Sequence, residues 1–350
     1  MEKIKVGVLG ATGTVGQRFI TLLEGHPWFE LSEVAASDRS AGKTYEEAVA
    51  GRWKVGPDIP ERVKKMTVKP VEPGLDCKIV FSAMDASVAG PIEEAFAGAG
   101  YCVFSNSRNH RMDPDVPLLL PEINHEHVRV LEHQRKNRGW KGFIVTNSNC
   151  STMGLVIPLK PLDVHFGLEA VNVVTMQAIS GAGYPGVSAL DIIDNVVPYI
   201  GGEEPKMESE PLKMLGSLKG NQFVDATFKV SAQCNRVFVL DGHLECVNVK
   251  LKEKPSLEAF TAALANFRGR PQELRLPSAP DPLIVVRPEQ DRPQPRLDRD
   301  HGKGMAVTVG RIRPCSLFDY KFLLLSHNTL RGAAGASILN AEFLKAEGYL

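Results

Sequence analysis

Short apolar runs alternate with amphipathic stretches through the first half of the chain. Four apolar runs have the length of buried strands, at 4–9, 31–36, 78–83 and 101–104, and the stretches 15–23 and 87–97 have helical spacing. Strands alternating with helices are typical of βαβ units in a parallel sheet. With 143–146 as the last strand, the pattern predicts a Rossmann-like α/β domain over residues 1–148.

The pattern changes after residue 148. Longer strand candidates of alternating character follow at 170–179, 227–235, 244–251, 305–311 and 320–325. Alternation suits a mixed or antiparallel sheet with helices on one side. We therefore predict a second, α+β domain over residues 149–328. A helix rich in alanine and leucine is expected near the C-terminus, where residues 329–350 would complete the first domain.

The stretch between Pro271 and Lys303 has a different composition. It is rich in proline, arginine and aspartate, and its only apolar run is 283–286. Clusters of such residues mark loops. We expect a surface excursion or a subunit arm there.

Composition narrows the class of protein. The 350 residues are 43% hydrophobic and 23% charged, and 41 basic residues balance 41 acidic ones. These values are ordinary for a globular chain, and a net charge of zero argues against a nucleic-acid partner. At roughly 100 to 200 residues per domain, the length agrees with two domains.

The cysteines and the lengths of the apolar runs bear on the cellular compartment of the protein. The six cysteines form no CxxC pair and no regular framework, so reduced thiols are expected. No apolar run approaches the roughly 18 residues that span a bilayer, and the chain starts with a strand-like segment rather than a signal peptide. We expect a cytoplasmic protein with no membrane partner.

A glycine-rich segment, GATGTVG at 10–16, lies between the first strand and the first helix. Glycines at Gly10, Gly13 and Gly16 would let the backbone turn tightly and approach a pyrophosphate at the helix N-terminus. Ala11 departs from the G-x-G-x-x-G register. A glycine-rich turn without a ligand is the alternative, but the strand before and the helix after favour a dinucleotide site.

The end of the second strand bears on cofactor choice. An acidic residue there bonds the ribose of NAD, whereas Ser37, Arg39 and Ser40 offer two hydroxyls and a guanidinium for a 2′-phosphate. NADP is therefore favoured. Asp38 leaves NAD open, since its carboxylate could be the ribose ligand.

One cysteine has the surroundings of a nucleophile. Cys150 follows an apolar strand and precedes the apolar stretch 153–162, with polar residues on both sides. A helix N-terminus stabilises a thiolate and offers free amides to an oxyanion. The other five cysteines are expected to be small buried hydrophobes.

A thiolate nucleophile needs a partner for proton transfer. His243 lies at a sharp turn between two long strand candidates and is the preferred one of nine histidines. Three histidines, His125, His127 and His133, lie close together in a polar helical stretch, which we expect to be a solvated helix face. No cysteine or carboxylate cluster matches them, so no metal site is predicted.

Taken in order, the motifs carry a family resemblance that covers nearly the whole chain. They are GATGTVG at 10–16, SNCST at 148–152, SGAGYPG at 180–186, EEPK at 203–206, RVFVLDGH at 236–243 and NTLRGAAGA at 328–336. The chain resembles aspartate-semialdehyde dehydrogenases of the branch seen in archaea and fungi. The resemblance implies a second domain like the C-terminal domain of glyceraldehyde-3-phosphate dehydrogenase, used for catalysis, substrate binding and dimerisation.

The resemblance also implies roles for individual residues. Cys150 would be the acylated nucleophile and His243 the acid/base, in agreement with the residues themselves. Arg236 would bind the substrate carboxylate, while Glu203 and Lys206 would hold the substrate amine and a phosphate. The implied remaining substrate ligands are Arg111 for phosphate, with Arg108 close enough to compete, Asn149 for phosphate and Gln177 for the acyl group. Without the resemblance, Arg236, Glu203 and Lys206 would read as a surface ion-pair set.

The expected cofactor is NADP. The predicted cofactor-binding residues are Gly10, Thr12, Gly13, Thr14, Val15, Ser37, Arg39, Ser40, Ser82, Ser180, Gly183 and Asn328. The other expected partners are a small-molecule substrate, inorganic phosphate and further copies of the chain in a homodimer or homotetramer.

The function implied is NADPH-dependent reductive dephosphorylation of L-aspartyl 4-phosphate to L-aspartate 4-semialdehyde, in the biosynthesis of lysine, methionine and threonine. Malonyl-CoA reductase and N-acetyl-glutamyl-phosphate reductase are alternatives of the same chemistry. Glu203, kept for an amino group, argues against the former, and the motifs fit the latter less well. A non-catalytic NADP-binding sensor would dispense with Cys150 and His243, and both are present.

Overall fold

A computed structural model describes residues 2–350. The helices are α1 Thr14–Leu23, α2 Tyr45–Ala48, α3 Glu61–Lys64, α4 Ala86–Gly98, α5 Pro121–Asn124, η1 His125–Val130, α6 Leu131–Arg138, α7 Cys150–Phe166, η2 Ile179–Ala182, α8 Ala189–Ile192, α9 Glu203–Met214, α10 Leu257–Ala265, α11 Arg270–Glu273, α12 Pro295–Asp298, α13 His301–Gly304, η3 Leu330–Ala334 and α14 Gly335–Ala346. The strands are β1 Ile4–Leu9, β2 Phe29–Ala35, β3 Ile79–Ser82, β4 Cys102–Ser105, β5 Phe143–Thr146, β6 Leu168–Gln177, β7 Ser217–Lys219, β8 Gln222–Val224, β9 Lys229–Arg236, β10 His243–Leu251, β11 Ile284–Arg287, β12 Val307–Pro314 and β13 Tyr320–Ser326.

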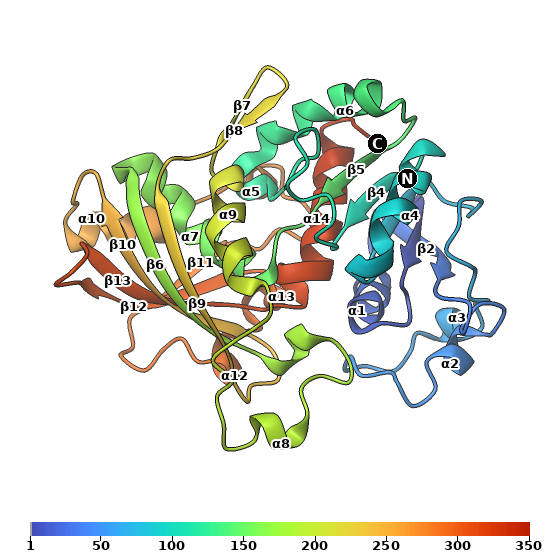
Figure 1. Cartoon of the computed structure of the whole chain (residues 1–350), viewed down its shortest axis with the longest axis horizontal. Helices are drawn as coiled ribbons and strands as arrows, with labels where there is room; N and C mark the ends of the chain where they lie inside the picture. Colours follow the sequence, from blue (N-terminus) through green and yellow to red (C-terminus); the bar gives the residue numbers. More distant parts are fainter. Residues whose placement is uncertain (1) are drawn as a thin grey trace.

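The first sheet is parallel throughout and has the strand order β2-β1-β3-β4-β5 (Figure 1). Every residue of β3 and β5 is buried, as expected of strands covered on both faces. Each strand and helix predicted for the first half is present within two residues of its expected ends. The predicted Rossmann-like sheet is confirmed.

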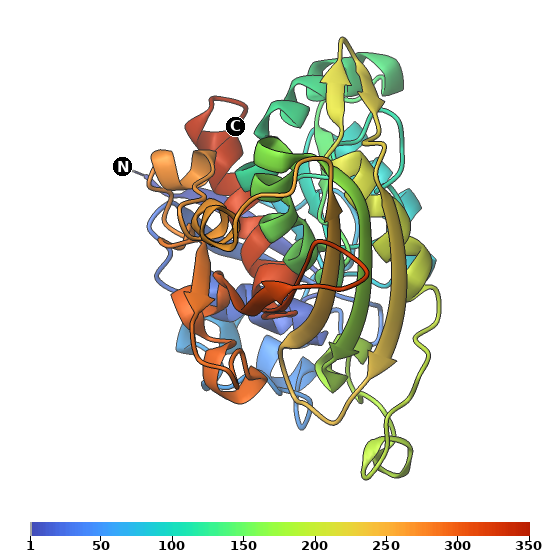
Figure 2. The ribbon, with the colours of Figure 1, turned by 90° about the vertical axis from the view of Figure 1, so that its left-hand side faces the viewer.

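The second sheet is mixed and has the order β11-β12-β13-β10-β6-β9. Its outer pairs, β11 with β12 and β6 with β9, are parallel, and the pairs between them are antiparallel. Figure 2 looks onto β10, β6 and β9 side by side. Alternate residues of β6 and β10 are buried, because helix α7 covers only one face of this sheet. The predicted mixed sheet is confirmed.

The C-terminal helix returns to the first sheet. Buried residues of α14, such as Ile338 and Phe343, belong to the same hydrophobic core as Val6 and Phe81. A polar contact reinforces this packing, because the Asn147 side-chain amide donates to Ser337 Oγ at 2.8 Å. The domain boundary at residue 148 stays a prediction, and residues such as Leu118 and Leu120, which precede it, pack in the core of the second sheet.

Two expectations about local structure were wrong. The stretch from Pro271 to Lys303 is no simple surface excursion, because it contributes β11 to the second sheet and buries Leu283. A parallel edge strand of four residues is too short to stand out in a polar segment. His127 is fully buried rather than solvated, with its ring centroid 5.0 Å from that of Phe223.

A buried ion pair joins η3 to α5. Arg331 Nη1 lies 2.6 Å from Glu122 Oε1, and neither side chain is exposed. Arg331 Nε also donates to the carbonyl of Met305 at 2.6 Å. The contact ties η3 to α5, at the level where the two cores meet. None of the helices in the described residues 2–350 combines the length and the apolar character needed to cross a membrane.

This pair yields a prediction about stability. Arg331→Met should lower the free energy of unfolding by about 3–5 kcal/mol, because it leaves the Glu122 carboxylate buried without a partner. The double variant with Glu122→Gln should recover part of that loss. Chemical denaturation measures both. Arg62→Met, which removes a half-exposed partner of Glu30, is the control and should change little. An Arg331→Met variant as stable as this control would contradict the prediction.

Candidate active site

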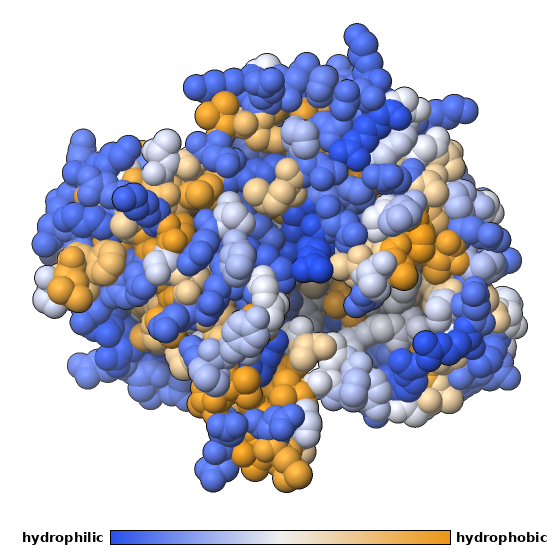
Figure 3. All heavy atoms as spheres, viewed as in Figure 1, coloured by the Kyte–Doolittle hydropathy of each residue, from blue (hydrophilic) through white to orange (hydrophobic). Residues whose placement is uncertain are grey.

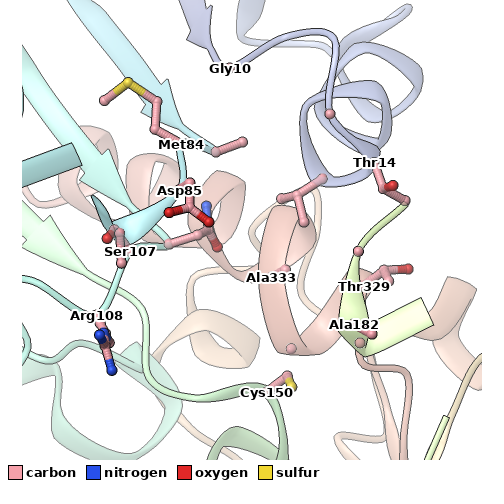
Figure 4. Close-up of a pocket in the computed structure, with 18 of the residues that line it drawn as sticks. Gly10, Thr14, Met84, Asp85, Ser107, Arg108, Cys150, Ala182, Thr329 and Ala333 are labelled. Atoms are coloured by element: carbon pink, nitrogen blue, oxygen red, sulfur yellow. The ribbon is translucent and has the colours of Figure 1, made fainter. Parts of the chain in front are cut away.

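A cavity of about 1140 Å³ lies between the two domains. Its lining comes from the β1–α1 loop, the ends of β2 and β3, the start of α7, the segment 180–184 and η3. In Figure 4 the turn at Gly10 and the side chain of Cys150 lie at opposite ends of it. The cavity is thus long enough to bring a ligand on the glycine loop to the cysteine.

Cys150 is the first residue of helix α7, as predicted. Asn149 is the N-cap, and its Oδ1 accepts hydrogen bonds from the amides of Ser151 at 3.0 Å and Thr152 at 3.2 Å. Capping fixes the start of the helix directly after β5 and its short polar turn. The thiol therefore faces the cavity from a rigid position near the positive end of the helix dipole.

The predicted partner of the cysteine lies next to it. His243 Nε2 is 3.2 Å from Cys150 Sγ, and the other ring nitrogen, Nδ1, accepts the main-chain N–H of Ala178 at 3.0 Å. His243 starts β10 after a turn in which Gly242 has φ +101°. The histidine is fully buried beneath the cysteine.

Burial shifts the pKa values of both His243 and Cys150. It lowers the pKa of His243 to about 3, and the positive charge of Arg236 acts in the same direction. It raises the pKa of the Cys150 thiol to about 12, with Glu203 adding to the effect. Arg236, Arg111 and Lys206 oppose that rise. In the absence of a ligand, burial thus disfavours the charged form of each of the two groups.

Helix α9 presents a charged face to the cysteine turn. Glu203 accepts from the Asn149 side chain at 2.7 Å and from Lys206 Nζ at 3.1 Å. Two helical turns further along α9, Glu210 accepts the Asn149 main-chain N–H at 2.6 Å and a hydrogen bond from Arg111 Nη1 at 3.0 Å. The structure thus brings four predicted residues, Asn149, Glu203, Lys206 and Arg111, into one network.

Sequence reasoning missed two members of this network, Glu210 and Lys213. Lys213 Nζ donates to the carbonyls of Arg111, Asp113 and Val116 at 2.7, 2.8 and 2.9 Å, which holds the loop that carries Arg111. Burial lowers the pKa of Lys213 to about 8. The signal was present in the sequence, since both residues continue the helical spacing set by Glu203 and Lys206.

The arginines surround the cysteine from different elements. Arg236, at the end of β9, lines the cavity, and its Nη1 donates to the carbonyl of Ala178 at 2.7 Å. Arg111 and Arg108 both line the cavity, so the choice between them for phosphate stays open. Gln177 is buried and, within the described part of the chain, is not among the residues that line the cavity; its Nε2 donates to Thr175 Oγ1 at 3.3 Å.

The glycine loop fits a pyrophosphate. Gly10 has φ +74°, and a Cβ there would lie 2.7 Å from the carbonyl oxygen of Ala83. A Cβ on Gly16 would lie 2.3 Å from the carbonyl oxygen of Gly10. The N-cap of α1 is Gly13, which has no side chain to accept hydrogen bonds from the first amides of the helix. The first amides of α1 are thus left for an anion.

Most of the predicted cofactor residues line the cavity. They are Gly10, Thr12, Gly13, Thr14, Val15, Ser37, Ser180, Gly183 and Asn328. Within the described part of the chain, Arg39, Ser40 and Ser82 are not among the lining residues. Arg39 is exposed beside Ser37 and Asp38. Ser82 is fully buried and donates to Glu93 Oε1 at 2.5 Å, so its hydroxyl is turned away from any cofactor.

Asn328 connects the loops on either side of the cavity. Its Oδ1 accepts the main-chain N–H of Gly242 at 2.9 Å, and its Nδ2 donates to Ser180 Oγ at 2.8 Å. The bond to Gly242 fixes the residue before His243. Asn328 thereby ties the histidine turn to the segment at Ser180 that lines the cofactor end of the cavity.

The π-helix η3 is a second element whose role the sequence did not reveal. Gly332 lines the cavity directly against the nucleophile, since a Cβ there would lie 2.7 Å from Cys150 Cβ. Single π-helical turns are often found at functional sites. The conspicuous glycines and alanines at 332–336 were the available signal.

Comparison with known proteins agrees with this geometry. Residues 5–131 match the family "Semialdehyde dehydrogenase, NAD binding domain" and residues 159–331 match "Semialdehyde dehydrogenase, dimerisation domain". Aspartate-semialdehyde dehydrogenase of Archaeoglobus fulgidus is 52% identical over 346 residues, and that of Schizosaccharomyces pombe is 52% identical over 357, each alignment covering 99% of both chains. The chain belongs to the aspartate-semialdehyde dehydrogenase family.

Solved structures of the family have the same architecture. The aspartate semialdehyde dehydrogenase of Candida albicans, determined with NADP, superposes with a TM-score of 0.92 at 48% identity and full coverage of both chains. Aspartate semialdehyde dehydrogenase II of Vibrio cholerae, complexed with ASA, superposes with a TM-score of 0.79 at 26% identity, again with full coverage. The fold is thus retained in relatives that differ at most positions.

The contact between η3 and Cys150 yields a prediction. Gly332→Ala should lower kcat by roughly 100-fold, because the new methyl group must displace the nucleophile from its place beside His243. Steady-state kinetics measures this, with thermal unfolding as the check on folding. Gly98→Ala is the control, since a Cβ there meets its nearest atom at 3.8 Å. Wild-type kcat in Gly332→Ala would show that the backbone of Cys150 tolerates displacement.

Proposed function

We propose that the chain catalyses the NADPH-dependent reductive dephosphorylation of L-aspartyl 4-phosphate to L-aspartate 4-semialdehyde, through a thioester on Cys150. The observation that carries the proposal is the 3.2 Å approach of Cys150 Sγ to His243 Nε2, at the end of a cavity that reaches the glycine loop. The family relationship supports the same assignment. The product is a precursor of lysine, methionine and threonine in that family.

The first half of the reaction is acyl transfer. Cys150 Sγ attacks the acyl carbon, the C–S bond forms, and the bond from carbon to the phosphate oxygen breaks. His243 is the hydrogen-bonding partner of the sulfur, and the resemblance implies an acid/base role for it. The positive end of the α7 dipole favours negative charge near the attacked carbon.

The two anionic ends of the substrate need separate cationic sites. Arg236, with its planar fork, suits the α-carboxylate, and Glu203 suits the α-amine. Lys206 and Arg111, with Arg108 as the competing arginine and Asn149 beside them, suit the phosphate. Glu203 and Glu210 already hold Lys206 and Arg111 in place, so these cations are preorganised. Gln177 is proposed to help position the acyl group from below.

The cofactor would lie along the cavity with its pyrophosphate on the loop at Gly10–Gly13. Ser37 lines the cavity where the adenosine ribose would lie, and Arg39 is near enough in sequence to turn its guanidinium toward a 2′-phosphate. Ser180, Gly183 and Asn328 would enclose the nicotinamide end. When bound, NADPH supplies the hydride that reduces the thioester to the aldehyde.

The alternatives are less well supported. A malonyl-CoA reductase would have no amino group for Glu203, which is buried and bonded within the site. A sensor without catalysis would have no use for a cysteine and a histidine in hydrogen-bonding contact. The family relationship argues against N-acetyl-glutamyl-phosphate reductase.

We propose a homodimer, with a tetramer as the alternative. The matched dimerisation domain supports an oligomer. One face of the second sheet has no covering helix, and the neighbouring segment at α8 carries exposed apolar side chains, among them Leu190, Ile193, Val196 and Tyr199. They form part of the hydrophobic cluster at the bottom of Figure 3. A second copy would cover this surface.

We infer a cytoplasmic location from the state of the thiols. The structure leaves all six cysteines free within residues 2–350, which suits a reducing compartment.

The activity is tested in the reverse direction with L-aspartate 4-semialdehyde, NADP and inorganic phosphate. Reduction of NADP should require phosphate, and CoA should not replace it. Cys150→Ala should abolish turnover and Cys150→Ser should lose nearly all of it, because an alcohol is far less nucleophilic at neutral pH. Cys102→Ala, at the start of β4 and outside the cavity lining, is the control. Activity with CoA alone, or full activity in Cys150→Ala, would overturn the assignment.

Cofactor choice is tested at Arg39. A charge-assisted bond to phosphate contributes on the order of 1.5–3 kcal/mol, so Arg39→Ala should raise the Kd of NADP by roughly ten- to a hundredfold and leave that of NAD unchanged. Fluorescence titration measures both constants. Lys43→Ala, another exposed cation nearby, is the control. Equal losses for the two cofactors would reject the 2′-phosphate contact.

A further inference from the structure

An ion pair joins helix α1 to the turn that carries His243. Arg18 Nη2, on α1, donates to Asp241 Oδ2 at 3.4 Å, and the two residues are 223 positions apart in the sequence. Their side chains are 19% and 10% exposed, so the contact is largely shielded from water. Salt screens a shielded pair much less than a surface pair. The contact therefore links an element of the first domain to one of the second.

Each partner of this pair depends on the other. Asp241 Oδ1 and Arg18 Nε are buried and make no hydrogen bond within residues 2–350. The bond from Arg18 is thus the only one that the described residues donate to the Asp241 carboxylate. Removing either side chain would leave the charge of the other largely buried and without a partner. The pair is accordingly more than an incidental surface contact.

On one side the pair is connected to the glycine loop. Thr14 and Arg18 lie four residues apart on one face of α1, and Thr14 lines the cavity (Figure 4). Gln17, beside Arg18, donates from Nε2 to the carbonyl of Thr12 at 3.0 Å, which joins the helix to the loop before it. A ligand on the glycine loop is therefore held in register with Arg18.

On the other side the pair is connected to the catalytic histidine. Asp241 lies two residues before His243, and its carbonyl accepts a hydrogen bond from Arg299 Nη1 at 3.2 Å. The next residue, Gly242, donates its main-chain N–H to Asn328 Oδ1 at 2.9 Å. These bonds fix the turn, so a displacement of the Asp241 carboxylate would be transmitted to His243.

We propose that Arg18 and Asp241 are positioning residues, whose ion pair holds the glycine loop in register with the Cys150–His243 pair for the hydride-transfer step. The proposal rests on the proposed function, in which the cofactor lies along the cavity from the loop to the cysteine. Within residues 2–350, neither residue of the pair lines the cavity, so both act through the elements that they join.

The physical reason is that different elements hold the two reacting groups. The acyl group would be bonded to Cys150 at the start of α7, whereas the cofactor would be bound at the β1–α1 loop. A misplacement of about 1 Å between reacting atoms can slow a reaction roughly a hundredfold. A link between α1 and the histidine turn therefore bears on hydride transfer more than on the formation of the thioester.

The hydride step is isolated by mixing enzyme, L-aspartate 4-semialdehyde and NADP without phosphate. The Cys150 thiol adds to the aldehyde carbon, and the C–H bond of the adduct then breaks with its electron pair going to NADP. The products are the thioester, NADPH and a proton from the new hydroxyl group. Because no phosphate is present to release the thioester, the initial burst of NADPH reports hydride transfer and not turnover.

Arg18→Met and Asp241→Asn should each slow this burst by roughly ten- to a hundredfold. Arg18→Lys, which keeps the charge, should recover part of the rate. The Kd of NADP and the rate at which iodoacetamide alkylates Cys150, followed by peptide mass spectrometry, should stay close to wild type, because neither the glycine loop nor the thiol is altered. Arg296→Met, the same substitution at an exposed arginine on α12, is the control and should leave the burst unchanged.

Two kinetic outcomes would overturn the proposal. One is a burst at the wild-type rate in Arg18→Met. The other is a loss of alkylation rate as large as the loss of burst rate, which would place the effect on the cysteine itself. No burst in the wild-type enzyme would instead overturn the proposed function, and with it the role in hydride transfer.

Denaturation tests the pair without substrate or cofactor. The denaturation midpoint of the double variant, Arg18→Met with Asp241→Asn, should fall by less than the sum of the falls in the two single variants, because each single variant leaves one charge unpaired. Strictly additive falls would show that the two side chains do not interact, and would overturn the proposal whatever the substrate of the enzyme.

Discussion

The 3.2 Å separation between Cys150 Sγ and His243 Nε2 depends on two sheets holding their strand ends against each other. Cys150 follows β5 of the first sheet, and His243 starts β10 of the second. Helix α7 connects the sheets, since it begins at the cysteine and then packs under the second sheet. A shift of either sheet would separate the pair, so the interface between the domains sets the geometry of the nucleophile.

Two buried carboxylates organise the polar and cationic groups around the cysteine. Glu210 binds both the Asn149 amide and Arg111, and Glu203 binds Lys206 and the Asn149 side chain. Each carboxylate thereby orients a cation that lines the cavity. A chain with no net charge can in this way present a cationic site to a substrate with two anionic ends.

Main-chain groups do much of the positioning. The amide of Ala178 donates to the His243 ring, and the backbone of η3 packs against Cys150. Such groups are more rigid than long side chains, and they cost little reorganisation when charge develops. The buried pair of Arg331 and Glu122 keeps η3 in register with the rest of the site.

The sequence by itself determined the elements and the chemical candidates. Periodicity located both sheets, because one face or both faces of each strand are buried, and local spacing identified the glycine loop and Cys150, because a turn between strand and helix is a local feature. The ordered motifs then supplied roles for Arg236, Glu203 and Lys206, which spacing alone could not. The helical spacing on α9 also contained Glu210 and Lys213, but only their partners reveal their use.

Tertiary structure decided what depends on contacts between distant segments. The apolar run 283–286 was visible, but it could not be assigned to the sheet, since a short parallel edge strand is stabilised by its neighbour β12 rather than by its own pattern. The bond of Ser82 to Glu93, on the following helix, is likewise visible only in the fold. The contact of Gly332 with Cys150 and that of Ala178 with His243 join residues 182 and 65 positions apart. Backbone donors carry no signature in the residue type, so contacts of this kind follow from the fold alone.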